Sequence, residues 1–283
     1  RENQWGFVDF NRPMVAINQW EQAADSMYTL CGKDRIHPST DGHLVMAYLF
    51  LKAQGLAGKP VADIRIDGAG KKVTRSDNCR VSDLSISSDN LTFTYEAKSL
   101  PYPIDTSYYD NEKHTQADAL SVIPFMDEMN YEGLSVSGLS DGYYGLTIGG
   151  EFIGRFTARE LERGINMALL QNTPQYKQAM KIRQMNEERW LKERKMREFY
   201  WVEYNLMRKT GMLWACNEAA VDTLRKYRPH DIFLQWNGAL WLQYMHKGIR
   251  EDCVNEQQDL VNQIYEQNKP IPLRIEIKKF TDL

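Results

Sequence analysis

The spacing of hydrophobic and polar positions changes three times along the chain. In residues 1–58, a short apolar segment at 5–10 predicts a strand, and apolar positions at helical spacing predict helices at 14–24 and 40–54. Gly55 then stands where a glycine commonly ends a helix. One strand and two helices cannot cover both faces of a parallel sheet, so this region needs neighbours that the rest of the chain does not obviously supply.

Residues 59–156 alternate with period two. In the segment Asn90–Ala97, the apolar Leu91, Phe93 and Tyr95 are separated by polar side chains, which is typical of a half-buried strand. Several short strands separated by turns predict a small antiparallel β-sandwich. Five further segments have the same character: 61–67, 81–86, 134–136, 143–148 and 151–156.

Residues 157–283 are mainly helical in pattern. Thr157 and Glu160 have the spacing of a capping box and predict a helix to about residue 170. Thr173 and Pro174 predict the start of a long helix, since neither Gly nor Pro follows until Gly211. Further helices are predicted at 215–227, 231–246 and 250–267, and the alternating segment 271–280 is predicted to return as an edge strand of the sandwich.

These patterns predict three parts: an α/β remnant at 1–58, an antiparallel β-sandwich at 59–156, and a helical region with a returning strand at 157–283. The chain has 35 Lys and Arg against 38 Asp and Glu, so no overall charge attracts it to nucleic acid or anionic lipid. The longest apolar run, 44–51, is too short to span a membrane.

The four cysteines, at positions 31, 79, 216 and 253, form no Cys-x-x-Cys pair and have no histidine at zinc-ligand spacing. We expect free buried thiols, no metal ion and no cofactor. His114, His230 and His246 are likewise isolated in sequence.

Asp34 and His37 form the strongest candidate for catalysis. An Asp three residues before a His in a turn can accept a hydrogen bond from the imidazole Nδ1–H. That bond fixes the tautomer and leaves Nε2 free to take a proton from a nucleophile. The alternative is that the pair only precedes and caps the following helix.

The stretch 6–56 resembles the C-terminal end of the GDSL or SGNH hydrolase family, in which the Asp and His of a serine triad share one loop. Asp34, Ile36, His37 and Pro38 match that block, and Gly42-His43 with an apolar helix matches its continuation. Residues 143–168 also resemble the long secreted members that act on carbohydrate esters. The resemblance implies the C-terminal part of a three-layer α/β domain, and a secreted or periplasmic location.

The Gly-Asp-Ser nucleophile block of that family is absent from the sequence. Ser140 lies in a predicted turn and Ser39 at a predicted helix start, so neither is expected to be the nucleophile. We therefore expect a serine-type ester hydrolase of carbohydrate or small-alcohol esters, with nucleophile and oxyanion donors on a missing N-terminal segment or companion chain. Residues 1–283 alone should then be inactive.

A non-catalytic carbohydrate-binding or scaffolding protein, built on a degenerate hydrolase remnant, is the alternative. Under either hypothesis, Trp236 and Trp241 are interpreted as core anchors of the helical region. His43, one helical turn beyond His37, is either a polar group near the catalytic pair or a surface side chain. The sequence identifies no substrate-binding residues.

Overall fold

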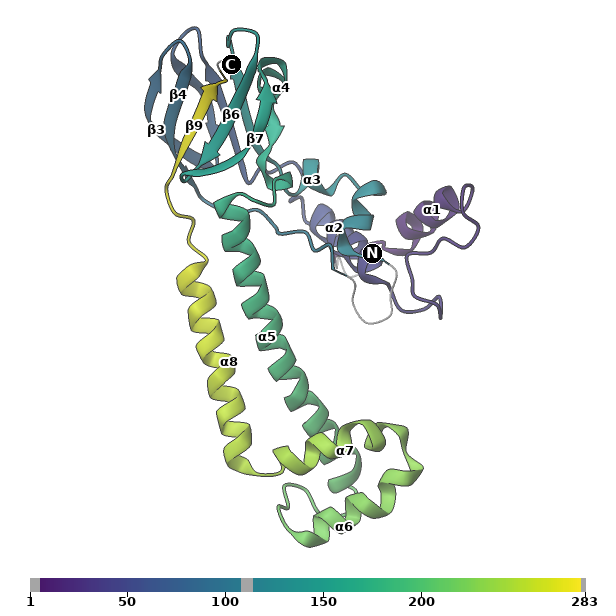
Figure 1. Ribbon diagram of the computed structural model, residues 1–283. Coiled ribbons are helices and arrows are strands. Elements are labelled where there is room, and N and C mark those ends of the chain that lie inside the picture. Colours follow the sequence, from purple (N-terminus) through teal and green to yellow (C-terminus); the bar gives the residue numbers. More distant parts are fainter. Residues whose placement is uncertain (1–5, 108–113, 281–283) are drawn as a thin grey trace. The chain divides into compact units, whose positions relative to one another are not determined.

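The computed structural model describes residues 6–107 and 114–280 (Figure 1). It is a mixed α/β structure with two sheets and a helical C-terminal region. The chain divides into two compact units: unit 1 contains Arg1–Ala179 and Lys269–Leu283, and unit 2 contains Met180–Asn268. The expected boundaries near residues 58 and 156 both lie inside unit 1, and the division into three domains stays a prediction.

Unit 1 contains both sheets. The four-stranded sheet has the order β2-β1-β5-β8 and the five-stranded sheet has the order β3-β4-β9-β6-β7. Seven strands occur at segments where alternation predicts them: β1 (Ala62–Asp67), β3 (Cys79–Ile86), β4 (Asn90–Ala97), β5 (Glu132–Ser137), β6 (Tyr143–Ile148), β7 (Glu151–Thr157) and β9 (Leu273–Lys279). β5 is longer than its predicted segment, 134–136. Alternation did not identify β2 (Lys72–Asp77) or β8 (Ile165–Asn166).

Two features of the sheets differ from the prediction. β1 and β5 pair in parallel, from Ala62 opposite Glu132 to Asp67 opposite Ser137, so the strands are not all antiparallel. β9 pairs with both β4 and β6, so it is a central strand and not an edge strand (Figure 1). Alternation identifies a strand and its buried face, but it carries no information about the direction or number of its neighbours.

The two sheets share one hydrophobic core, as a sandwich requires. The inward side chains of both sheets form a single buried cluster. Ile64 and Leu134 enter it from the smaller sheet, and Phe93, Leu146 and Ile275 enter it from the larger one; all five are essentially inaccessible to solvent. Within the described residues, the sandwich therefore has the core that the period-two pattern predicts.

The first region contains α1 (Asn11–Glu21) and α2 (Thr40–Ala53), close to the predicted helices. The predicted strand at 5–10 is wrong for its described part, residues 6–10, which form no strand; Trp5 lies outside the described residues. An extended segment needs a hydrogen-bonding neighbour to become a strand, and no described strand pairs with residues 6–10. Instead, α2 packs with the 3₁₀-helix η1 (Gln116–Ser121) and α3 (Phe125–Glu128) around a second buried cluster.

Thr157 caps α4 (Ala158–Arg163) through the predicted capping box: its hydroxyl accepts from the N–H of Glu160 at 3.2 Å, and the Glu160 carboxylate accepts from the N–H of Thr157 at 2.7 Å. The prediction of a helix to residue 170 is wrong, because Gly164 follows with φ +93°. That left-handed backbone ends the helix. The chain continues through β8 and the short η2 (Met167–Leu169).

The long helix predicted after Thr173 is α5 (Pro174–Val202), which continues into a π-helical turn, η3 (Glu203–Met207). Unit 2 contains the greater part of α5 together with η3, α6 (Glu218–Tyr227), η4 (Arg228–His230), α7 (Ile232–Tyr244) and α8 (Lys247–Gln267). Inside this unit α5 and α8 lie side by side, and Lys192 pairs with Glu256 at 2.7 Å (Figure 1).

Unit 2 has its own buried core, with Phe199 from α5, Leu224 from α6 and Trp241 from α7. The interpretation of Trp241 as a core anchor is confirmed, since its side chain is fully buried. For Trp236 it is wrong, because this indole is 65% exposed. Among the described helices, none combines the length and the apolar character needed to cross a bilayer.

Candidate active site

The segment from Leu30 to Ser39 is a tight loop that leads into α2. A backbone bridge joins Cys31 to Pro38, and the N–H of Gly32 donates to the carbonyl of His37 at 2.8 Å. The N–H of Ser39 donates to the carbonyl of Leu30 at 3.0 Å and closes the loop. The two ends of the loop are thereby fixed, and its tip projects with Asp34 and His37 on it.

Asp34 and His37 lie in direct contact at that tip. His37 Nδ1 and Asp34 Oδ2 are 2.5 Å apart. Asp34 Oδ1 accepts from the backbone N–H of Ile36 at 2.9 Å and from that of His37 at 3.0 Å, so the carboxylate is held in place by the turn itself. The hydrogen bond from His37, followed by those from the two backbone N–H groups, lowers the pKa of Asp34 to about 2.

The imidazole of His37 is open to solvent. Its side chain is 84% exposed, and that of Asp34 is 47% exposed. In the described parts of the chain, no serine hydroxyl forms a hydrogen bond with His37. Nδ1 of the ring is thus held against the carboxylate of Asp34. The rest of the imidazole, including Nε2, is accessible to solvent or to another molecule.

The two serines considered from the sequence lie in other surroundings. Ser39 is buried, and its hydroxyl donates to the Leu30 carbonyl at 3.0 Å and to the carboxylate of Asp41. Ser140 is exposed on the sandwich, where Lys279 Nζ donates to its oxygen at 2.8 Å. Both hydroxyls are engaged away from His37.

A second Asp-His pair was not recognised from the sequence. Asp41 and His114 approach to 3.4 Å, and the buried Asp41 carboxylate also accepts from Ser39. Here the carboxylate lies between the hydroxyl and the imidazole, so the histidine has no direct path to the serine proton. The cluster holds the beginning of α2, and only tertiary folding brings His114 to it. His43 lies exposed on α2.

Gly42 allows α2 to approach the loop 30–39. A Cβ at this position would lie 2.0 Å from the carbonyl oxygen of Leu30. No L-amino acid with a side chain fits there unless the backbone moves. The glycine therefore sets the distance between α2 and the loop that carries Asp34 and His37.

We expect Gly42→Ala to lower the free energy of unfolding by about 1–3 kcal/mol, because the added methyl group overpacks a backbone contact. Gly32→Ala is the matched control in the same loop, since its Cβ would meet the nearest atom at an ordinary 3.7 Å. Chemical denaturation of both variants measures the difference. Equal stability of the two variants would contradict the close approach of α2 to Leu30.

The structure offers no evident metal centre: among the described residues, no three or more His, Cys, Asp and Glu side chains are grouped to hold a metal ion. The four cysteines are free; Cys79 and Cys253 are buried, Cys31 is half-buried and Cys216 is exposed. Cys216 Sγ lies 3.3 Å from His246 Nδ1, and these two groups alone do not complete a coordination sphere.

Comparison with known proteins gives two similarities. Residues 180–269 match the family model of the diltiazem deacetylase C-terminal helical domain, which coincides with unit 2. A solved structure described as a gut microbial diltiazem-metabolizing enzyme is 42% identical with a TM-score of 0.93. The match covers 99% of this chain and 63% of that one, so the chain spans less than two thirds of the relative. No curated protein matches the chain.

Proposed function

We propose that this chain belongs to a serine-type ester hydrolase in which His37 is the general base and Asp34 orients it. The observation that carries the proposal is the 2.5 Å contact between Asp34 Oδ2 and His37 Nδ1 beside an imidazole that is otherwise exposed. The similarities to a deacetylase domain and to a diltiazem-metabolizing enzyme support ester hydrolysis in general. The assignment to an SGNH-type mechanism rests on the sequence resemblance around Asp34 and His37.

In this mechanism, His37 Nε2 takes the proton of a serine hydroxyl as the oxygen attacks the ester carbonyl. The imidazolium then gives that proton to the departing alcohol, and a water molecule repeats the sequence to release the acid. Asp34 stays ionised at neutral pH, because its pKa is about 2, and it stabilises the imidazolium throughout. Its hydrogen bonds to the backbone N–H groups of Ile36 and His37 keep the carboxylate from rotating when the His37 ring moves.

We further propose that the nucleophile and oxyanion donors lie on polypeptide outside residues 1–283, either a preceding segment or a companion chain. Two observations support this. The sequence has no Gly-Asp-Ser block, and 63% of the relative's chain is covered by the match. The proposed substrate is an acyl ester of a carbohydrate or small alcohol, and the proposed location is secreted or periplasmic.

The proposal is tested with residues 1–283 alone and with a longer natural protein that includes them. We expect the 283-residue chain to hydrolyse p-nitrophenyl acetate no faster than buffer, and the longer protein to hydrolyse it and to react with a fluorophosphonate. A triad works as a unit, so one half of it should give negligible turnover. Fluorophosphonate labelling of a serine within residues 1–283, with matching turnover, would contradict the division.

A further inference from the structure

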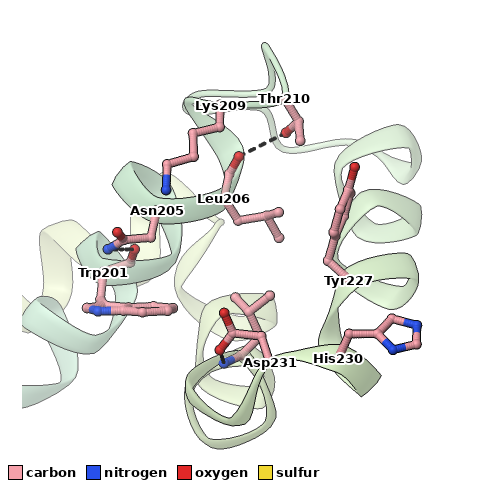
Figure 2. Close-up of a pocket in the computed structure, with 9 residues that line it drawn as sticks. Trp201, Asn205, Leu206, Lys209, Thr210, Tyr227, His230 and Asp231 are labelled. Atoms are coloured by element: carbon pink, nitrogen blue, oxygen red, sulfur yellow. Dashed lines mark hydrogen bonds between the residues drawn. The ribbon is translucent and has the colours of Figure 1, made fainter.

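Unit 2 contains a pocket whose lining residues are far in sequence from Asp34 and His37. Its volume is about 370 Å³, and it is formed by the end of α5, the π-helical turn η3, the end of α6, η4 and the start of α7 (Figure 2). Every lining residue belongs to unit 2, so the pocket is complete within one compact body. Its shape and chemistry can therefore be read without reference to unit 1.

Aromatic side chains form two walls of the pocket. Trp201 and Tyr227 lie on opposite sides, and Leu206 points into the space between them (Figure 2). The aromatic surface continues outward from Trp201. Its ring centroid is 5.3 Å from that of Phe233, and Phe233 is 5.4 Å from Trp236. Phe233 and Trp236 are exposed, so aromatic rings continue from the pocket to solvent.

Polar groups of both kinds surround the aromatic walls. Asp231 Oδ1 accepts from the backbone N–H of Phe233 at 2.8 Å and of Leu234 at 3.1 Å, so the cap of α7 uses one oxygen of this carboxylate. The amide nitrogen of Asn205 donates to the Trp201 carbonyl at 3.0 Å, which leaves its oxygen as an acceptor. Lys209, drawn beside Asn205 on the same side of the pocket, supplies an ammonium donor (Figure 2).

The wall that carries Asn205 and Leu206 is held in place from behind. Glu203, the first residue of the π-helical turn, is buried, and its carboxylate accepts from Trp241 Nε1 and from the backbone N–H of Trp214, both at 2.8 Å. π-Helical turns within α-helices often occur at functional sites. The buried Glu203 carboxylate, with its two donors, therefore anchors this turn at the wall of the pocket.

From this combination we infer that the pocket of unit 2 binds a sugar ring at the end of, or within, a short oligosaccharide. A pyranose has an apolar face of C–H groups that stacks on an indole, and hydroxyls that both donate and accept hydrogen bonds. Trp201 provides the platform, Lys209 the donor, and Asp231 and Asn205 the acceptors. A hydrocarbon ligand would leave these polar groups desolvated without partners, which is costly.

The aromatic row at Phe233 and Trp236 extends the platform for the next sugar units. The Trp201–Phe233 pair has an interplanar angle of 36° and the Phe233–Trp236 pair one of 82°, so the ring plane turns from one aromatic side chain to the next. This inference concerns unit 2 alone and does not depend on the proposed esterase site in unit 1. Failure of either one leaves the other intact.

The experiment is saturation-transfer NMR and calorimetry on the full 283-residue chain, with cellotriose, xylotriose, mannotriose and chitotriose as probes. We expect saturable binding of at least one trisaccharide. Asp231→Asn keeps an oxygen to cap α7 but replaces the free carboxylate oxygen with an amide nitrogen, and it should weaken binding about tenfold. Lys209→Met should do the same. Trp201→Ala should abolish binding.

Trp190→Ala is the matched control, because Trp190 is an exposed indole on α5 that does not line the pocket. Its affinity should equal that of the unchanged protein. Three results would overturn the inference: no saturable binding of any probe, binding that Asp231→Asn and Trp201→Ala leave unchanged, or Trp201-dependent binding of the apolar dye anilinonaphthalene sulfonate without any sugar binding. Self-association abolished by Trp236→Ala, without sugar binding, would instead identify a contact between copies.

Discussion

Replacement of His37 with alanine, in protein that also carries the nucleophile, is expected to lower kcat for ester hydrolysis by at least about 10³-fold. In the proposed mechanism the imidazole held by Asp34 accepts the serine proton, so its loss leaves the hydroxyl without that base. Because His37 is exposed, the truncation removes little buried surface, and the fold should be unaffected. Circular dichroism and thermal unfolding check the fold, and steady-state kinetics measure the loss.

Asp34→Asn tests whether Asp34 orients the His37 ring, apart from its role in forming the turn. Its side-chain oxygen can still accept from the N–H groups of Ile36 and His37, so the turn should keep its form. The amide nitrogen, however, would donate toward His37 Nδ1 and favour the tautomer that has its proton on Nε2, where it cannot act as a base. A loss of about 10³–10⁴-fold in kcat is expected.

His43→Ala is the control for both variants, because His43 is exposed on α2 and carries no role in the proposed mechanism. Its kinetics should match those of the unchanged protein. Full activity of His37→Ala would remove His37 from the mechanism. If His43→Ala lost as much activity as His37→Ala, the effect would not be specific to His37, and the proposal would be contradicted.

Glu132 should make the stability of the sandwich depend on pH. This side chain on β5 is fully buried; Tyr95 donates to it at 2.8 Å, and the amide of Gln175 lies 3.3 Å away. Burial raises the pKa of Glu132 from its ordinary 4.5 to about 7, although the two hydrogen bonds act in the opposite direction. The native state therefore holds this proton more tightly than the unfolded chain does.

The sign of the effect follows from that difference. Below pH 4.5, Glu132 is protonated in both the folded and the unfolded state, and its burial costs no ionisation energy. Between pH 4.5 and about 7, only the unfolded state loses the proton. The free energy of unfolding therefore falls as pH rises through this interval. The total loss is about 3 kcal/mol, and it is complete above the folded pKa. Glu132→Gln keeps the shape and cannot ionise, so its advantage over the unchanged protein should grow across this interval.

Denaturant unfolding of the two proteins at several pH values between 4 and 8.5 measures this difference directly. The change between the proteins isolates Glu132 from the other acidic groups, which both proteins share. Glu162→Gln, at an exposed position on α4, is the control and should keep the pH profile of the unchanged protein. A constant difference between Glu132→Gln and the unchanged protein across the range would show that Glu132 does not titrate within it.

Much of the local structure follows from the sequence. The capping box at Thr157, the start of α2 at Thr40 and the alternation in β4 each depend on residues within a few positions of one another. The contact between Asp34 and His37 is equally local, since a turn of four residues holds both side chains. The spacing predicted this contact, and the resemblance of the surrounding stretch 6–56 to a hydrolase family made the pair a candidate site.

Tertiary structure decided the rest. β9 becomes a central strand through pairing with β4, nearly two hundred residues earlier, and β1 lies parallel to β5 because of the path of the chain between them. His114 reaches Asp41, and Trp201 faces Tyr227 across a pocket, only after distant helices pack. Periodicity records which face of a segment is buried, whereas the identity of the neighbour depends on chain segments far away. The sequence thus determined most of the elements and one local pair of side chains, and the fold determined the contacts between segments distant in sequence.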